Sequence, residues 1–144
     1  MNITAKSKYA VRALVELAHR ASDTPVPLVV IAEAREIPTQ FLEQLFATLR
    51  RAGILQSHRG VYGGFSFNRS PDQVSVLDVV EALDGPIEPA LCTTSEACSK
   101  RTVCSVGDVW VLAKVAVEDV LAGVSIQELA DKEAVQDGST MYYI

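Results

Sequence analysis

Long apolar runs are missing from this chain of 144 residues, although 49% of its residues are hydrophobic. No stretch approaches the roughly 20 consecutive apolar residues of a membrane-spanning helix. The opening residues, MNITAKSKYAVRAL, also lack the apolar core of a signal peptide. We therefore expect no membrane partner and a location in the cytoplasm. The length suits one domain with a small extension.

Signatures of catalysis are missing as well. The sequence contains only two histidines, and it shows neither a nucleophile paired with a base nor a phosphate-binding loop. The glycines around Tyr62 lie in a predicted hairpin, whereas such a loop lies between a strand and a helix. We therefore predict that the protein is not an enzyme.

Cysteine is scarce, and its placement is the most informative feature of the chain. Cys92, Cys98 and Cys104 are separated by five residues each within the segment LCTTSEACSKRTVCSVGD. An odd number of cysteines argues against a simple disulfide framework. Clustered thiolates bind iron, zinc or copper(I) well, so the spacing indicates a soft-metal site. A thiol or disulfide switch stays open, because Lys100 and Arg101 favour thiolates, which oxidise reversibly.

Charge is unevenly distributed along the chain, whose formal net charge is −5. Residues 1–70 carry nine Lys and Arg against five Asp and Glu, whereas residues 71–144 carry four against thirteen. A basic first half on an acidic chain favours a partner with phosphate groups for that half alone. Chance segregation of solvated charge is the alternative explanation.

The first half predicts a helix-turn-helix unit. Apolar residues recur at helical spacing in Ser7–Arg20 and again in Thr39–Arg51, with a short helix at Leu28–Arg35 between them. Proline at position 38 suits the first turn of the third helix, and Gly53 suits the position just after its end. Two helices joined by a turn of four residues or fewer have helix-turn-helix spacing.

A β-hairpin is predicted directly after this unit. Ile54–Ser57 and Phe65–Asn68 are expected to be its strands, and the glycine-rich HRGVYGG its turn. A hairpin in this position is a wing. A further helix is expected over Ser75–Leu83, with Ser75 as its N-cap and Asp78 three residues later. The fold class is therefore mainly α, a winged helix-turn-helix with a small β-hairpin.

A long apolar helix is predicted over Ser105–Ala122. Its apolar residues need burial on more than one side, part of which we expect a partner subunit to supply. Ser125 and Glu128 form a capping box for a short last helix, and a flexible tail is expected from Gln136. The stripe expected to face the partner comprises Val106, Val109, Trp110, Ala113, Val117 and Val120.

These elements give a domain plan of four segments. Residues 1–84 are expected to form the winged helix-turn-helix domain and residues 85–104 a cysteine-bearing loop. Residues 105–135 would hold the dimerisation helix and the short last helix, and residues 136–144 the tail.

At this point the chain resembles the IscR/NsrR/CymR-type winged-helix transcription regulators of bacteria, an iron–sulfur cluster regulator family. The matching runs are KSKYAVRAL, IPTQFLEQLFATLRRAGILQSHRG, SVLDVVEALDGP and SIQELA, which together cover nearly the whole chain. The resemblance implies a homodimer that binds double-stranded DNA at a pseudo-palindromic operator. It also implies that the three cysteines bind a 2Fe-2S or 4Fe-4S cluster, on which nitric oxide or oxygen could act as the signal.

DNA contacts are expected on the third helix, the wing and the first helix. The N-terminal part of the third helix would enter the major groove. Arg59 is the favoured single contact, in a narrow minor groove, and a solvated carboxylate is the alternative for Glu43. The candidate DNA-binding residues are Thr39, Gln40, Glu43, Arg50, Arg51, Arg59, Tyr62, Lys6 and Lys8.

The fourth ligand of the implied cluster is not evident from the sequence. Relatives use a histidine three residues after the third cysteine, where this chain has Gly107, or an acidic residue near the start of the first helix, where it has Lys8. We favour Asp108, four residues after Cys104, over Glu96, solvent or a small thiol. Three functional classes thus remain: a cluster-sensing regulator, a cluster-free regulator with a thiol switch or zinc, and, least favoured, a redox protein without DNA binding.

Overall fold

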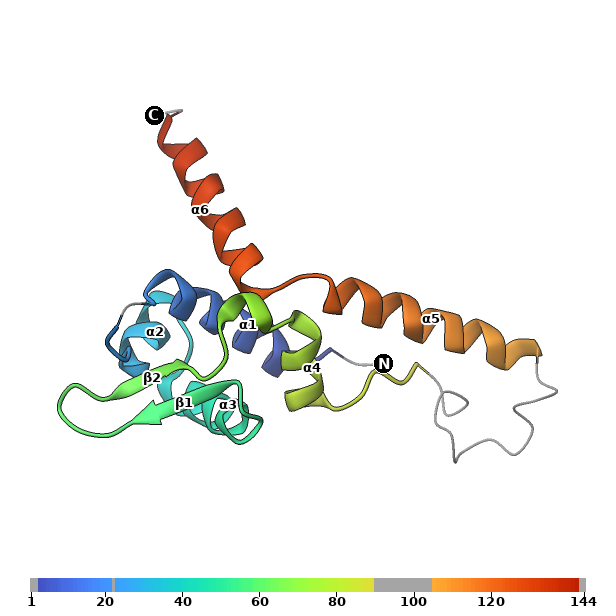
Figure 1. The fold of residues 1–144 in the computed structure, drawn as a ribbon, viewed down its shortest axis with the longest axis horizontal. Coiled ribbons are helices and arrows are strands. Elements are labelled where there is room, and N and C mark those ends of the chain that lie inside the picture. The colour runs from blue at the N-terminus through green and yellow to red at the C-terminus, as the bar shows by residue number, and fades with distance from the viewer. Residues whose placement is uncertain (1–2, 22, 90–104, 143–144) are drawn as a thin grey trace.

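The structure of the protein is a computed structural model that describes residues 3–21, 23–89 and 105–142. Within these ranges lie six α-helices, one short 3-10 helix and a two-stranded antiparallel sheet. Figure 1 shows a winged helical body, formed by the first half of the chain, from which two further helices extend in different directions. The expected class, mainly α with a small hairpin, is confirmed.

The helix-turn-helix consists of α2 (Leu28–Ala34) and α3 (Thr39–Arg51), with residues 35–38 between them. The observed bounds of α3 are those predicted from the sequence. Glu36 in the turn has a φ of 53°, a conformation that lets the chain reverse direction sharply. Ile37 follows it and is 4% exposed, so the turn is held by an apolar anchor. The predicted turn of four residues or fewer is therefore confirmed, with α2 ending one residue before its predicted end.

Helix α1 (Ala5–His19) packs beside this unit and begins two residues before the predicted start. Thr4 occupies the N-cap position in an extended conformation, and Ala5 and Lys6 are good helix formers that let the helix start early. Apolar side chains of α1, α2 and α3 form the core together with residues of the wing and of the segments that follow it, including Ile126 near the C-terminal end. Its largest fully buried members are Phe46, Leu14, Leu17, Ile31, Leu42, Leu49, Ile54, Leu55, Ile126, Val74, Val79 and Val80.

The wing is formed by β1 (Leu55–His58) and β2 (Gly64–Phe67), in a register that pairs Leu55 with Phe67 and His58 with Gly64. Each strand is shifted by one residue from its predicted position. The reason is that Ile54 is buried in the core, and its backbone N–H donates to the Leu49 carbonyl at the end of α3. The two predicted outer residues still pair, since the Asn68 N–H donates to the Ile54 carbonyl at 2.9 Å.

A third chain segment, at Val26, pairs with strand β2 of the wing, and no sequence pattern predicted this pairing. Val26 pairs with Phe65 through two backbone hydrogen bonds of 2.9 and 2.8 Å. Gly64 permits this close approach, because a side chain there would collide with the Val26 carbonyl. The loop before α2 thereby fixes the angle of the wing relative to the helix-turn-helix.

Helix α4 (Val76–Asp84) follows a short 3-10 turn, η1 (Pro71–Gln73), and begins with the predicted capping box. The Ser75 hydroxyl accepts from the Asp78 N–H, and the Asp78 carboxylate accepts from the Ser75 N–H, both at 3.0 Å. Ser125 and Glu128 form the second predicted box, at 2.9 and 3.1 Å. Both helix starts are therefore confirmed.

Helices α5 (Ser105–Ala122) and α6 (Ile126–Tyr142) complete the structure. Helix α5 has its predicted bounds and projects away from the body, while α6 packs across α1 (Figure 1). The prediction of a short last helix that ends before Gln136 was wrong, since α6 continues to Tyr142. No proline interrupts this stretch, and a single helical glycine costs only about 1 kcal/mol. Within the part of the chain that the structure describes, no helix is long and apolar enough to cross a membrane.

Candidate nucleic-acid interface and cysteine segment

The exposed face of α3 carries the residues that the sequence predicts to read DNA. Thr39, Gln40 and Glu43 are all exposed at its N-terminal end, whereas Leu42 and Leu45 on the opposite face are buried. The amphipathic pattern of α3 therefore presents its polar side chains to solvent at the end that follows the helix-turn-helix turn. The structure brings these three side chains together, as expected.

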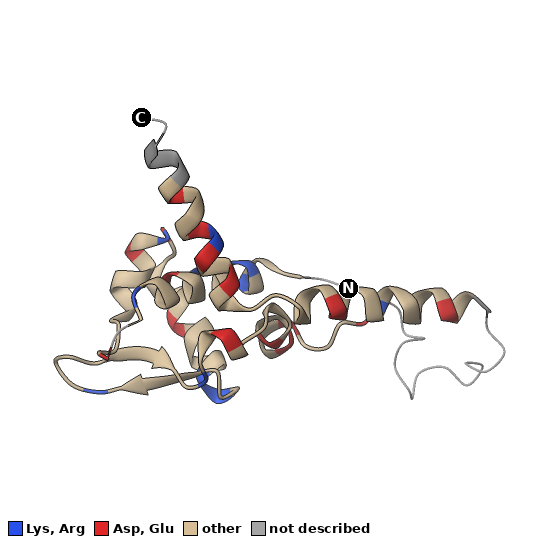
Figure 2. Cartoon of the chain, turned by 45° about the horizontal axis from the view of Figure 1, so that its top comes forward, with Lys and Arg blue, Asp and Glu red and all other residues tan. Residues whose placement is uncertain are grey.

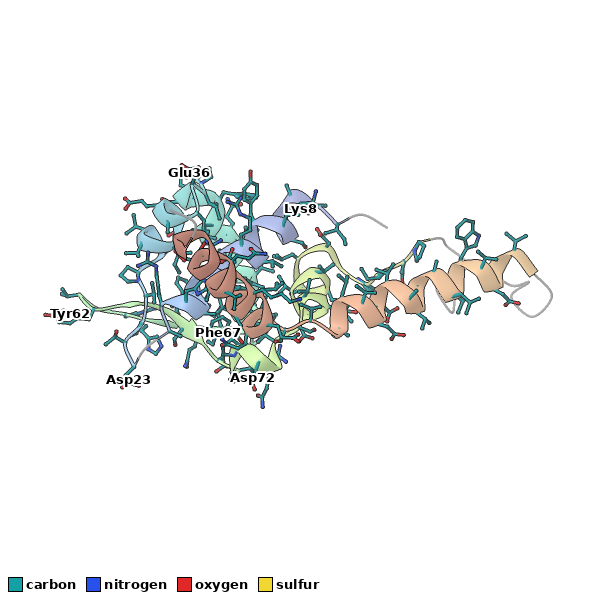
Figure 3. The ribbon with its side chains drawn as sticks, turned by 90° about the horizontal axis from the view of Figure 1, so that it is seen from above. Lys8, Asp23, Glu36, Tyr62, Phe67 and Asp72 are labelled. Carbon is teal, nitrogen blue, oxygen red and sulfur yellow. The ribbon has the colours of Figure 1, made fainter. Side chains whose placement is uncertain are left out.

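The tip of the wing presents a second exposed surface. Arg59 is the first residue of the loop between the strands, and Tyr62 is 88% exposed at the far end of the hairpin (Figure 3). Val61 beside it is 96% exposed, a position the sequence analysis did not single out. His58 lies at the end of β1, as expected, and its ring nitrogen pairs with the Ser66 hydroxyl at 2.8 Å across the sheet.

The two arginines at the end of α3 lie on opposite flanks of the helix. Arg50 donates to the Ser57 hydroxyl on β1 at 3.3 Å, so its guanidinium lies on the side of the wing. Arg51 donates to the Thr48 hydroxyl at 3.2 Å and lines a groove that it shares with Lys6 of α1. Both were predicted as DNA-binding residues, and the structure places one cation toward the wing and the other toward α1.

The two lysines predicted to contact DNA lie on different sides of α1. Lys6 faces α3 across the groove that contains Arg51, whereas Lys8 lines an apolar pocket with Val80 of α4 and Leu121 of α5. Only Lys6 is therefore continuous with the exposed surface of α3. A sequence spacing of two residues already places side chains far apart around a helix, which is the reason for the separation.

The start of α1 is attached to the end of α4 through one carboxylate. Asp84 accepts hydrogen bonds from the Thr4 N–H at 2.9 Å and from the Thr4 and Ser7 hydroxyls at 2.6 Å each. Burial alone would raise the pKa of Asp84, but these hydrogen bonds outweigh it, and the pKa is lowered. Since residues 85–104 follow directly, this contact fixes the point at which the cysteine segment leaves the body.

A second charged contact attaches α6 to the helix-turn-helix. Arg35, at the end of α2, donates two hydrogen bonds to Glu133 at 2.9 and 2.8 Å, and His19 of α1 pairs with the same carboxylate at 3.0 Å. The hydrogen bonds from Arg35 lower the pKa of Glu133 to about 2. His19 thus has a structural role in this contact. The partners are 98 and 114 residues apart, so no local sequence signal could have revealed this contact.

The predicted metal ligands Cys92, Cys98 and Cys104, and the alternative Glu96, lie outside the described residues. Asp108 is exposed in the first turn of α5, close in sequence to the third cysteine. Among the described residues, no group of three His, Cys, Asp or Glu side chains is placed to hold a metal ion. The sequence offers three thiols outside the described residues and one exposed carboxylate four positions after the third of them, and soft thiolate donors would fit iron or zinc.

Helix α5 carries apolar side chains that its own chain leaves exposed. Val109 is 57% and Val120 67% exposed, and Figure 3 shows side chains extending from both sides of the projecting helix. Ala113 and Val117 are half-buried, so the predicted stripe is only partly covered. Two further exposed apolar residues, Leu112 and Val115, lie outside that stripe.

Charge is segregated between these surfaces. Helices α5 and α6 carry seven Asp and Glu residues against two lysines, and Figure 2 shows these acidic positions along both helices. Six of the nine basic residues of the first half lie on α1, α3 and the wing. The uneven charge of the sequence therefore becomes a basic helix-turn-helix side and an acidic C-terminal side.

Comparison with known proteins agrees with this arrangement. The family model "Rrf2: Iron-dependent Transcriptional regulator" matches residues 3–132. The regulator IscR of Aliivibrio salmonicida is 36% identical over 96% of this chain and 83% of its own length. The regulator CymR of Bacillus subtilis is 32% identical over the full length of both chains.

Solved structures show the same fold. The crystal structure of CymR, the global cysteine regulator of B. subtilis, has a TM-score of 0.77 at 30% identity and covers 92% of this chain and 98% of its own. T. potens IscR has a TM-score of 0.73 at 28% identity, over 92% of this chain and 88% of its own. These relatives are named as regulators and not as enzymes. With its winged helix-turn-helix and a family match over nearly its whole length, the chain belongs to the Rrf2 family of DNA-binding transcription regulators.

Proposed function

We propose that the protein is a cytoplasmic homodimer that binds a pseudo-palindromic DNA operator and changes its DNA affinity through a cluster held by Cys92, Cys98 and Cys104. The observation that carries the DNA-binding part is the shared exposure of the α3 N-terminus and the wing. A helix-turn-helix places the N-terminal residues of its second helix against base edges in the major groove.

Base readout is assigned to Thr39, Gln40 and Glu43 of α3. A glutamine can bind adenine through two hydrogen bonds, and a carboxylate can accept from the cytosine amine. Arg59 in the wing loop would enter the minor groove, where a narrow A·T-rich segment attracts a guanidinium. Tyr62 at the tip would pack on the sugar–phosphate backbone. Each of these side chains is exposed and lies outside the core.

The homodimer is supported by α5. A helix with Val109 and Val120 more than half exposed presents more apolar surface than a lone regulator would be expected to leave in water. An apolar pocket of about 330 Å³ continues this surface at the junction of α1, α4 and α5. A second copy would cover both features, and the two-fold axis would present two α3 helices to two half-sites.

The cluster is supported by the donor set and by the family description, which names iron. Three thiolates would leave one position of a 2Fe-2S or 4Fe-4S cluster to another ligand, for which Asp108 is the proposed carboxylate. When bound, the cluster would supply a centre that reacts with nitric oxide or oxygen. Asp84, just before the cysteine segment, is hydrogen-bonded to the start of α1. Through this contact a change in the cysteine segment could alter the position of the DNA-facing elements.

A cluster-free thiol switch, or zinc bound by the same thiols, is the second candidate. The comparisons favour it about as much as the first, since the chain matches CymR, described as a cysteine regulator, over its full length. Staphylococcus aureus CymR, 27% identical with a TM-score of 0.68, has been crystallised in an oxidized form. Clustered thiols near basic residues can oxidise reversibly without any metal.

Anaerobic purification separates the two candidates. The cluster predicts a brown protein with equal iron and sulfide and visible absorption, and the loss of most iron in the Cys98→Ala variant. A colourless protein with three free thiols or bound zinc would contradict the cluster and favour the switch. Asp108→Ala should shift the spectrum or speed oxygen damage without complete loss of the cluster, and an unchanged spectrum and lifetime would remove Asp108 from the ligand set.

DNA reading is tested by selecting the preferred duplex from a random library and then comparing variants on it. Arg59→Ala should weaken binding by about 1–3 kcal/mol. Arg20→Ala, on the far end of α1, is the charge-matched control. Unchanged affinity of the Arg59 variant at fixed salt would remove the wing arginine from the reading surface. Failure to select any duplex would contradict the proposed function as a whole.

A further inference from the structure

A groove between α1, α3 and α4 contains two cations and no carboxylate. Its polar lining consists of Lys6, Gln44, Thr48 and Arg51, its apolar lining includes Leu83 of α4, and its volume is about 410 Å³. We call it the α1–α3 groove. Among the described residues, neither Lys6 nor Arg51 forms an ion pair with an acidic side chain. Arg51 therefore carries a charge that no acidic side chain of the described residues pairs with, while Lys6 lies near the Asp84 carboxylate and adds to the hydrogen bonds that lower the pKa of that group.

A second polar pocket, between α1, α2 and α6, shows that this is unusual within the molecule. It also contains two arginines, but acidic side chains line it in equal number to its basic ones. Its ionisable lining residues are Arg12, His19, Arg35, Glu16, Glu133 and Asp137. In that pocket Arg35 pairs with Glu16 and Glu133, and Arg12 donates to the Arg35 carbonyl and lies over the Tyr9 ring. The lining of the α1–α3 groove contains no carboxylate that could pair with its two cations in this way.

A neighbouring hydroxyl holds the guanidinium of Arg51 in place. The Thr48 hydroxyl accepts from Nη2 of Arg51 at 3.2 Å and donates to the Gln44 carbonyl at 3.2 Å. It occupies one of the five N–H donors of the guanidinium and leaves the others available. Lys6 lies in the first turn of α1, where Thr4 and Ser7 on either side of it are bonded to Asp84.

The place of the groove relative to DNA follows from the two flanks of α3. Arg50 leans toward the wing through Ser57, and the α1–α3 groove lies on the opposite flank. A helix in the major groove lies between two phosphate backbones, one on each side. The flank of α3 that carries the α1–α3 groove, away from the wing, therefore faces one of them.

We infer that the α1–α3 groove binds one backbone phosphate of the DNA, held by Arg51 and Lys6 together and by the side-chain amide of Gln44. The inference rests on the proposed reading of DNA by α3. Arginine suits this role because its planar donors match phosphate oxygens in pairs, while lysine adds a compact charge. A contact of this kind fixes the depth and register of α3 without reading sequence itself.

The test compares Lys6→Gln, Arg51→Gln and the double variant with Lys132→Gln on the selected duplex. Lys132 lies on α6, at a distance from the groove. Its substitution removes one positive charge, as each single variant does. The double variant should reduce the slope of log K against log salt by about 1, since one phosphate contact is lost. The Lys132 variant should leave the slope unchanged. The two single variants should also be non-additive, because both cations bind the same phosphate.

A chemical version of the same test locates the phosphate. Duplexes are prepared with one methylphosphonate at a time in place of a backbone phosphate, which removes a single charge. At one position in each half-site, the wild-type protein should lose as much affinity as the double variant loses on unmodified DNA. On that modified duplex, the double variant should then bind as tightly as the wild type.

Two results would overturn the inference. One is a double variant with the salt slope and affinity of Lys132→Gln, and the other is the absence of any methylphosphonate position that removes the effect of the substitutions. If Arg59→Ala still weakens binding in that case, only the groove is refuted. If no duplex is bound by the wild type, the proposed function fails instead.

Discussion

The attachment of α6 to the helix-turn-helix through Glu133 makes a quantitative prediction. Arg35 lowers the pKa of Glu133 from 4.5 to about 2, and each pKa unit corresponds to about 1.4 kcal/mol. The full shift would give about 3.4 kcal/mol, but the side chain is 39% exposed, and solvent screening reduces the contribution. We expect Glu133→Gln to lower the free energy of unfolding by about 1–2 kcal/mol at pH 7.

The pH dependence of this loss has a definite sign. A carboxylate whose pKa is lower in the folded protein stabilises it above the unfolded pKa, and the contribution is lost as pH falls through the folded value. The difference between wild type and Glu133→Gln should therefore shrink between about pH 4.5 and pH 2. For a shift of this size, about two fifths of it should remain at pH 3.

Urea unfolding at pH 7 and pH 3, at one fixed protein concentration, measures both quantities. Glu81→Gln is the matched control, because Glu81 is an exposed carboxylate on α4 whose side chain is not among the hydrogen-bonded or ion-paired groups of the described chain. This control should change stability by less than 0.5 kcal/mol. A loss below 0.5 kcal/mol for Glu133→Gln at pH 7, or one equal at both pH values, would refute the reasoning.

Three further predictions concern the dimer, the hydrogen bonds of Asp84 just before the cysteine segment, and a helix cap. Val109→Asp and Val120→Asp, both exposed in the single chain, should give monomers in sedimentation at micromolar concentration because a buried unpaired charge is costly; fully dimeric variants would contradict the proposed interface. Asp84→Asn weakens the hydrogen bonds that attach α1 to α4. We expect it to destabilise the fold by about 1–2 kcal/mol and to reduce DNA affinity through the position of Lys6. A normal DNA affinity would show that this contact does not contribute to DNA binding. Ser75→Ala removes the capping box of α4 and should cost about 1 kcal/mol in urea unfolding, whereas no loss would show that the cap is dispensable.

Local patterns were sufficient to predict most of the helices. The bounds of α3 and α5 follow from apolar spacing and from the residues that flank it, and both capping boxes occur where serine and an acidic residue are three positions apart. Each strand of the wing was predicted one residue away from its observed position. Ile54 is buried in the core, and its backbone N–H donates to the Leu49 carbonyl at the end of α3, so it lies before the first strand. The end of α6 was missed because a polar stretch was taken for a tail, although it contains no proline and a single helical glycine costs only about 1 kcal/mol.

Contacts between distant residues were beyond the reach of such patterns. The bonds of Asp84 to Thr4 and Ser7 span 80 and 77 residues, and the bond of Arg35 to Glu133 spans 98. The same holds for the α1–α3 groove, where Lys6 and Arg51 meet only after α1 has packed against α3. The candidate DNA-reading residues could be predicted because they lie on one helix and one loop, whose local geometry already determines their exposure.

The most direct test of the account is the DNA affinity of the wild type and of the Cys92, Cys98 and Cys104 triple alanine variant. Both are measured by fluorescence anisotropy on the selected duplex at one salt concentration, first in strictly anaerobic buffer and then after exposure to nitric oxide or oxygen. The account predicts that exposure changes the affinity of the wild type at least tenfold and leaves that of the triple variant unchanged. Equal affinities for both proteins under all conditions would contradict it and leave a winged-helix regulator whose cysteines play no part in sensing.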